Sequence, residues 1–124
     1  MNSKVFMVLR ILLGVFVLVF GLNKFFNFIP MEAPTGDAGA FFGALMSSNT
    51  LTMVAIIEVV TGIALIFNKY GALMALILMS VSVNAVLFHA TLDPENIMGA
   101  LVLIILNVAV LYGYKDKYAP LLQQ

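Results

Sequence analysis

Four long apolar runs dominate the sequence and restrict the folds that the chain can adopt. They extend over residues 5–26, 51–67, 72–92 and 97–114. A helix that crosses the hydrocarbon core of a bilayer needs roughly 20 mostly apolar residues, and all four runs come close to that length or exceed it. Because backbone polar groups in lipid must be paired within the segment, the runs should be helices. The predicted fold is an all-α polytopic membrane protein, a four-helix transmembrane bundle in which residues 1–124 form a single transmembrane domain.

The composition supports a membrane location and excludes several classes of function. Hydrophobic residues make up 63% of the chain and charged residues 10%, whereas a typical soluble domain is about one quarter charged. The lipid bilayer is therefore the expected surrounding. Six Lys and Arg balance six Asp and Glu without a basic patch, which argues against nucleic-acid binding. Cysteine is absent, so this chain alone carries no disulfide, thiolate metal site or dithiol redox centre.

The connections between the runs are short except for the first. Residues 38–46 within the long first loop are apolar but too few to cross a bilayer, so we expect a short interfacial helix that caps the bundle. NKYG is a tight link in which Gly71 is a candidate cap, and TLDPEN is a second short link. No small-x-small cleavage site precedes GLNKFF, so we do not expect the first run to be a cleaved signal peptide.

Positive charges predict the orientation, because Lys and Arg concentrate in short cytoplasmic loops. With the N-terminus inside, the inner face carries Lys4, Lys69, Lys115 and Lys117. The outer face then carries Lys24, Glu32, Asp37, Asp93 and Glu95. We therefore expect both termini to lie in the cytoplasm.

Polar residues inside the runs are candidates for a functional core, because such residues are costly in lipid and face the bundle interior. Counting from the inner helix ends places Arg10 at a depth of about 8 Å, Glu58 at about 14 Å and Asn107 at about 10 Å. We therefore predict that Arg10 pairs with Glu58 and that Asn107 is hydrogen-bonded nearby. Asn84 lies higher on the third helix and completes the candidate core. The candidate outer mouth consists of Asn23, Lys24, His89 and Asp93.

Helical spacing places these residues on polar or small stripes. One stripe of the first helix is Arg10, Gly14, Val17, Gly21 and Lys24. The second helix contributes Glu58 and Gly62, and the third contributes Ser80 and Asn84. Small residues in such stripes allow neighbouring helices to approach closely.

Structural interpretations of the same residues remain open. Arg10 would then snorkel to the inner interface, and Lys24 would reach the headgroups. Glu58 would belong to a purely structural ion pair, the Asn residues would join helices, and His89 would anchor a loop. No metal site is expected, because one His and scattered carboxylates have no ligand spacing. We find no self-contained catalytic motif, so enzymatic activity stays undecided at this point.

Three segments of the chain resemble the DoxX family of small four-helix membrane proteins. They are RILLGVFVLVFGLNKFF, AIIEVVTGIALIF and NAVLFHATLDPENIMGALVLIILNVAVLY. The features that carry the resemblance are Arg10, the run Gly21-Leu22-Asn23-Lys24-Phe25, Glu58 followed by Gly62, His89 ahead of Leu92-Asp93-Pro94, and Asn107. The resemblance implies a location in the bacterial inner (cytoplasmic) membrane. It also implies a link to membrane redox systems such as thiosulfate:quinone oxidoreductase and to partners that handle thiol or superoxide stress.

Three functional hypotheses follow. In the first, the protein is an inner-membrane accessory subunit of a redox system, at most an oxidoreductase subunit. It would have no intrinsic cofactor, and Glu58, Asn107 or His89 would lie near the carbonyls of a bound quinone or the cofactor would sit on a redox partner subunit. In the second, it is a non-catalytic assembly or binding protein whose Arg10 and Glu58 hold the helices in register. In the third, it is a small proton-coupled carrier, and we expect so narrow a bundle to need a homodimer for transport.

Overall fold

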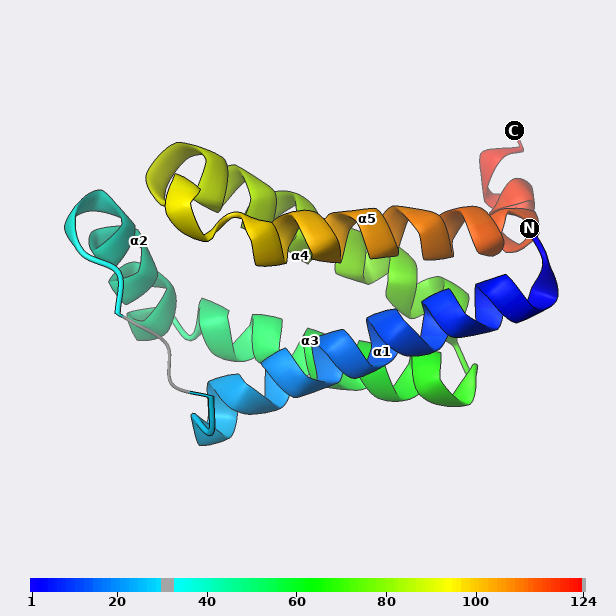
Figure 1. Ribbon diagram of the computed structural model, residues 1–124, viewed down its shortest axis with the longest axis horizontal. Coiled ribbons are helices and arrows are strands. Elements are labelled where there is room, and N and C mark those ends of the chain that lie inside the picture. The colour runs from blue at the N-terminus through cyan, green and yellow to red at the C-terminus, as the bar shows by residue number, and fades with distance from the viewer. Residues whose placement is uncertain (30–32, 124) are drawn as a thin grey trace.

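The computed structural model describes residues 1–29 and 33–123, and the described residues form helices and short connections without a strand (Figure 1). The long helices are α1 (Ser3–Phe26), α3 (Thr50–Phe67), α4 (Gly71–Leu92) and α5 (Met98–Gly113). The shorter ones are α2 (Gly36–Ser47), η1 (Pro94–Asn96), α6 (Lys115–Tyr118) and η2 (Ala119–Leu122). These bounds agree within a few residues with the four predicted spans.

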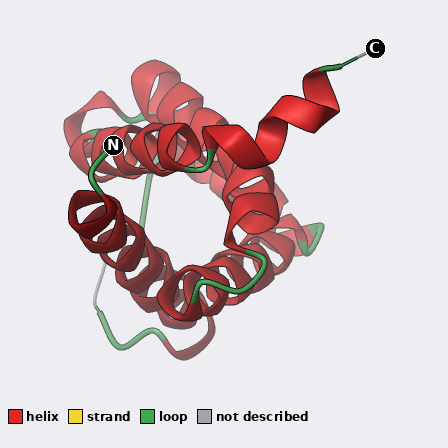
Figure 2. Cartoon of the chain, turned by 90° about the vertical axis from the view of Figure 1, so that its right-hand side faces the viewer, coloured by secondary structure: helices red, strands yellow, loops and turns green. Residues whose placement is uncertain are grey.

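The four long helices surround a common axis, as the view along the bundle shows (Figure 2). The order around the axis is α1, α3, α4, α5, and each helix packs on its two neighbours, with α1 and α3 in the most extensive contact. Leu13, Val17, Leu65, Leu78 and Val110 are fully buried at its centre. The fold is therefore the predicted helical membrane bundle.

The spanning capacity of the four helices differs. By length and composition α1, α3 and α4 can each cross a membrane. Helix α5 has 16 residues, so it is about 24 Å long. It is followed by a bend of 71°, after which α6 and η2 continue the chain, and the bent pair together provides a fourth candidate span.

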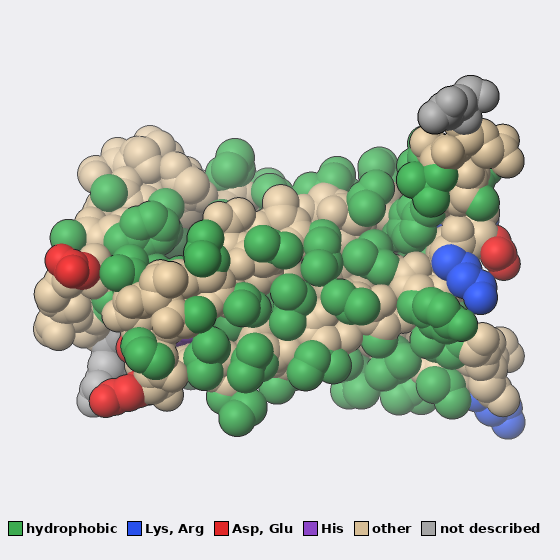
Figure 3. All heavy atoms as spheres, turned by 90° about the horizontal axis from the view of Figure 1, so that it is seen from above, with side chains coloured by type: hydrophobic (Ala, Val, Ile, Leu, Met, Phe, Trp, Pro, Cys, Tyr) green, Lys and Arg blue, Asp and Glu red, His purple; other side chains and the backbone are tan. Residues whose placement is uncertain are grey.

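Large apolar side chains are exposed along all four long helices, and they form a broad hydrophobic band on the face seen in Figure 3. Charged side chains lie at the two ends of that band, with Lys at one end and acidic groups mainly at the other (Figure 3). Soluble proteins rarely expose contiguous apolar surface of this kind. The protein is therefore built for contact with lipid.

Both termini lie at the same end of the bundle, as the predicted topology requires (Figure 1). Lys4 at the start of α1, Lys69 in the α3–α4 link and the two Lys of α6 belong to that end. Asp37, Asp93 and Glu95 belong to the opposite end, and Glu32 lies outside the described residues. Which end faces the cytoplasm stays a prediction.

The short helix expected at residues 38–46 is present as α2, two residues longer at the start and one at the end. It packs at the end of the bundle opposite the termini, where Phe41 stacks on Phe88 of α4 with ring centroids 5.4 Å apart and Phe42 approaches the same ring. These aromatic contacts attach the first loop to α4.

The α3–α4 link differs in detail from the prediction for NKYG. Helix α3 ends at Phe67, and its C-cap residue Asn68 has a φ of 53°, the left-handed conformation of a helix cap. Gly71 is the first residue of α4 and not a cap. A Cβ atom at Gly71 would collide with the hydroxyl of Tyr114, which donates a hydrogen bond to Asn68 Oδ1 at 2.5 Å. A side chain at position 71 would therefore force the Tyr114 ring to move from its position against the link.

Candidate functional site

Glycine contacts set the register of α1 against α3. A Cβ atom at Gly62 would lie 2.7 Å from the carbonyl oxygen of Gly14, and one at Gly21 would lie 2.9 Å from Glu58 Cβ. Both distances are shorter than real Cβ contacts, so the two backbones approach as closely as the missing side chains allow. The predicted stripe of α1 does face α3, because Arg10, Gly14, Val17 and Gly21 are all buried.

Glu58 forms an ion pair with Lys24, and the predicted pair between Glu58 and Arg10 is wrong. Lys24 Nζ lies 2.6 Å from Glu58 Oε1. The Lys24 side chain is 25% exposed and the Glu58 side chain 5%. Lys24 therefore bends inward to the carboxylate and does not extend to the headgroups.

The register of α1 against α3 explains why Lys24, and not Arg10, is the partner of Glu58. Depths counted separately from each helix end ignored the offset between α1, with 24 residues, and α3, with 18. Because Gly21 abuts Glu58, Lys24 begins about one helical turn farther toward the α2 end, and its four-carbon stem spans that turn. Arg10 lies 11 residues before Gly21 on the same helix, about 16 Å away along the axis.

Arg10 instead binds the carboxyl end of α3. Its Nη1 donates hydrogen bonds to the carbonyl oxygens of Leu65 and Ile66, the latter at 3.3 Å, while Nε has no partner within the described chain. Both carbonyls belong to the last turn of α3, whose carbonyls lack intrahelical partners. A cation is also favourable at this negative end of the helix dipole. Arg10 is therefore a cap supplied by a neighbouring helix.

Thr61 is a polar residue three positions after Glu58 and was not among the candidates selected from the sequence. Its side chain is fully buried, and its hydroxyl has no hydrogen-bond partner among the described residues. A threonine in a helix commonly bonds a carbonyl three or four residues earlier, and this one does not. Glu58 has no polar contact besides Lys24 within the same described residues. We call Lys24, Glu58 and Thr61 the carboxylate site.

Asn107 is buried but belongs to another interface, so its predicted place beside Arg10 and Glu58 is wrong. Its Nδ2 donates to the carbonyl of Ala75 at 3.0 Å, and its Oδ1 accepts from the Ser82 hydroxyl at 2.7 Å. Ala75 and Ser82 both lie on α4. Asn107 therefore joins α5 to α4, which is the structural alternative considered for it.

Asn84 is exposed, so its predicted place in the polar core is also wrong. The inward residues of α4 are Gly71, Ala75, Leu78 and Ser82. Ser80 and Asn84 lie on the other side of the helix, where Asn84 Nδ2 donates to the Ser80 carbonyl at 2.7 Å. The helix turns its small residues and Ser82 inward because these allow close packing and the bond to Asn107.

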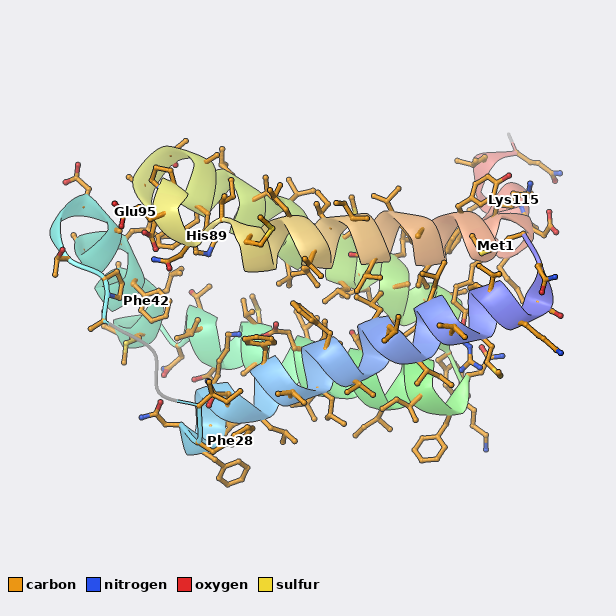
Figure 4. The ribbon with its side chains drawn as sticks, viewed as in Figure 1. Met1, Phe28, Phe42, His89, Glu95 and Lys115 are labelled. Atoms are coloured by element: carbon orange, nitrogen blue, oxygen red, sulfur yellow. The ribbon has the colours of Figure 1, made fainter. Side chains whose placement is uncertain are left out.

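The predicted outer mouth divides into two separate groups. Asn23 is buried and its Oδ1 accepts a hydrogen bond from the Ile29 backbone at 2.7 Å, so it holds the end of α1. His89 Nδ1 lies 3.7 Å from Asp93 Oδ2 at the end of α4. Figure 4 shows His89 at the same end of the bundle as Phe42 and Glu95, opposite Met1 and Lys115. Within the part of the chain that the structure describes, no hydrogen bond or ion pair links His89 or Asp93 with Lys24 or Glu58.

Within residues 1–29 and 33–123, no three His, Cys, Asp or Glu side chains group as metal ligands would. The side chains of the carboxylate site are an ammonium, a carboxylate and a hydroxyl, which can donate, accept and transfer protons.

A family model decides the relationship of this chain to known proteins. The DoxX model matches residues 5–91, from the first turn of α1 to the last turn of α4. The chain belongs to the DoxX family. All three residues of the carboxylate site lie within the matched region, and Asn107 lies beyond it. Neither a curated protein nor a solved structure matches the chain significantly.

Proposed function

We propose that this DoxX protein is an integral accessory subunit of a membrane redox system and contacts a quinone at the carboxylate site. The observation that carries the proposal is the Lys24–Glu58 pair. The Lys24 side chain is partly exposed at the edge of the α1–α3 interface. The Glu58 carboxylate is buried, and its Oε1 lies 2.6 Å from Lys24 Nζ. Intramembrane charges of this kind are expensive, and they commonly mark ligand or proton pathways.

The three side chains suit the recognition of a quinone head group. The Lys24 ammonium can donate a hydrogen bond to a carbonyl at the bundle surface, and Glu58 can accept or return a proton through Lys24. The unpartnered Thr61 hydroxyl offers a further donor on the inner side of Glu58. Phe25, which follows Lys24 and is exposed, provides apolar surface beside the site for an isoprenoid tail.

A bound quinone would supply the electron-accepting chemistry, and the electrons would come from a partner subunit. The chain has no cysteine and a single histidine, so it carries no dithiol and no pair of histidines for a haem. Its own contribution would be to position the head group and to deliver protons. The protein is an accessory subunit in the sense that the partner subunit, and not this chain, would supply the electrons.

Quinone content after gentle purification tests the proposal. The wild type and two variants, Lys24→Met and Lys69→Met, would be extracted with native lipids and analysed by mass spectrometry for bound quinone and partner chains. Lys69→Met is the matched control, because it removes one positive charge in the α3–α4 link at the other end of the bundle. We expect quinone to be retained by the wild type and by Lys69→Met and lost from Lys24→Met.

Two results would replace the proposal with an alternative. Absence of quinone and of partner chains from the wild type would favour a non-catalytic assembly or binding protein. Proton flux through the purified protein in liposomes, abolished by Glu58→Gln, would favour the proton-coupled carrier. Equal quinone content in all three proteins would place the ligand elsewhere.

We also infer that the end with both termini faces the cytoplasm of a bacterial inner membrane. Four Lys residues gather in the segments at that end, in agreement with the positive-inside rule. Reporter fusions after Gln123 and between Asp37 and Phe41 should report opposite sides of the membrane. Periplasmic activity of the C-terminal fusion would reverse the orientation.

A further inference from the structure

Helix α4 has a polar stripe on the face that is turned away from the bundle. Its buried residues are Gly71, Ala75, Leu78 and Ser82. Asn84 follows Ser82 by two residues, so it points about 160° away from Ser82 around the helix. Ser80, Asn84 and Thr91 are all exposed, and they follow one another at the spacing of a single helix face. This face should therefore contact lipid in an isolated bundle.

Asn84 lies close to the middle of the spanning segment. It is about 20 Å from the start of α4 along the axis, and the whole helix of 22 residues is about 33 Å long. Ser80 lies one turn nearer to the start. No water is available at this depth, so a polar group without a partner is costly there.

Asn84 differs from the two hydroxyl residues of the stripe because its own helix cannot satisfy all of its hydrogen-bonding groups. Ser80 donates to the Ile77 carbonyl at 2.8 Å and Thr91 to the Leu87 carbonyl at 2.7 Å, which uses the single proton of each hydroxyl. Asn84 Nδ2 donates to the Ser80 carbonyl at 2.7 Å and retains a second N–H. Its Oδ1 accepts no hydrogen bond in the described part of the chain.

We propose that this face of α4 is the interface with a second copy of the chain, in which the Asn84 carboxamides of the two copies bond each other. Two copies that share one orientation in the membrane are related by a two-fold axis along its normal, so each residue near the axis meets its own counterpart. A carboxamide contains one acceptor and an available donor, so two of them can form two reciprocal bonds. The group is neutral, so no partner of opposite charge is needed.

The surroundings of Asn84 match such an interface. Ile77 and Leu87, one or two turns away on the same face, are 39% and 59% exposed and provide apolar packing. Ser80 is small, which permits the close approach that interhelical hydrogen bonds require. This association is independent of quinone binding, because the carboxylate site lies between α1 and α3.

Disulfide cross-linking tests which face meets the second copy, and the cysteine-free chain makes single replacements unambiguous. Ser80→Cys and Leu87→Cys flank Asn84 and leave its side chain in place. Ile56→Cys is the matched control, because Ile56 lies at a similar depth on α3 and is 52% exposed. In native-like vesicles under mild oxidation, we expect dimers for the two α4 variants and monomers for Ile56→Cys. Monomers throughout, or equal dimers at Ile56, would overturn the proposal.

The role of the amide is tested by single-molecule counting of the labelled full chain at increasing dilution in liposomes. We expect Asn84→Leu to weaken dimerisation about tenfold, and Asn84→Gln, which retains the amide, to weaken it less. Thermal unfolding should confirm that both variants remain folded, since Asn84 bonds only its own helix. Unchanged dimerisation of folded Asn84→Leu would refute the proposal, and so would a monomeric wild type that binds a different membrane protein through α4.

Discussion

Arg10 and Glu58 are both buried in the interface between α1 and α3, but the two charges are stabilised in different ways. Arg10 binds two backbone carbonyls at a helix end, and the backbone cannot move away without unwinding the last turn of α3. The charge of Glu58 is balanced by the side chain of Lys24, which is one quarter exposed and has a flexible four-carbon stem. We therefore expect the Arg10 contacts to be rigid and the Lys24–Glu58 pair to open more readily.

The comparison indicates how a structural charge can be distinguished from one that is available for chemistry. A charge bound by backbone groups at a helix terminus stabilises that terminus and has few alternative partners. A carboxylate whose single cation can swing away, and which has the unpartnered Thr61 hydroxyl nearby, can exchange partners with a ligand. We therefore assign Arg10 to the scaffold and Glu58 to the candidate site.

Removal of Lys24 should have the largest effect on stability. Lys24→Leu leaves the Glu58 carboxylate without a cation in the interior, and breaking a buried pair costs about 3–5 kcal/mol. The partial exposure of Lys24 should reduce this to about 3 kcal/mol. Denaturant titration in mixed micelles would measure the loss. The double variant Lys24→Leu/Glu58→Leu should recover part of it, and simple additivity of the two single losses would show that the pair is not coupled.

Removal of Arg10 should cost somewhat less and should be independent of Glu58. Arg10→Leu removes charge-assisted hydrogen bonds to two carbonyls, a loss of about 2–3 kcal/mol. The same titration applied to Arg10→Leu, Glu58→Gln and the double variant should give additive losses within about 0.5 kcal/mol. A larger coupling free energy would indicate that Arg10 and Glu58 interact directly, and it would contradict the distinction between the two charges.

The register that separates the two charges should depend on Gly62. An added Cβ would lie 2.7 Å from the Gly14 carbonyl oxygen, so Gly62→Ala must push α1 and α3 apart. We expect a loss of about 1–2 kcal/mol. Gly43→Ala is the control, since its Cβ would meet nothing within 4 Å. Equal thermal shifts for the two variants would show that close glycine packing does not determine the register.

Replacement of Thr61 should have the smallest effect on stability and the most informative effect on binding. Thr61→Val keeps the shape and removes a hydroxyl that has no partner among the described residues, so stability should change by less than about 0.5 kcal/mol. If Thr61 faces a ligand, quinone retention should fall although the fold is intact. A clear loss of stability would instead indicate that the hydroxyl is bonded within the protein.

The helical bundle could be predicted from the chain alone because it depends on local and additive properties. Run length and hydropathy determine which segments can cross lipid, and the loop composition located α2 within two residues. The face of α1 that meets α3 also followed from spacing, because Arg10, Gly14 and Gly21 repeat at helical intervals. Span length and the buried face of a helix can be read without knowledge of which helix lies next to which.

The partners of the polar residues were decided only by the tertiary structure. The sequence predicts Arg10 and not Lys24 as the partner of Glu58, because helix ends define depth to within a turn or two while a salt bridge requires agreement within a few ångströms. For a related reason Asn84 is exposed although it was expected in the core, and Asn107 is buried but bonds α4 instead of lying beside Arg10 and Glu58. The orientation of α4 is set by packing of its small residues and by the bond between Ser82 and Asn107, which depends on contacts 25 residues apart. Sequence thus determined that charges and amides would be buried in a membrane bundle, whereas their pairing required the register and rotation that only close packing of the helices specifies.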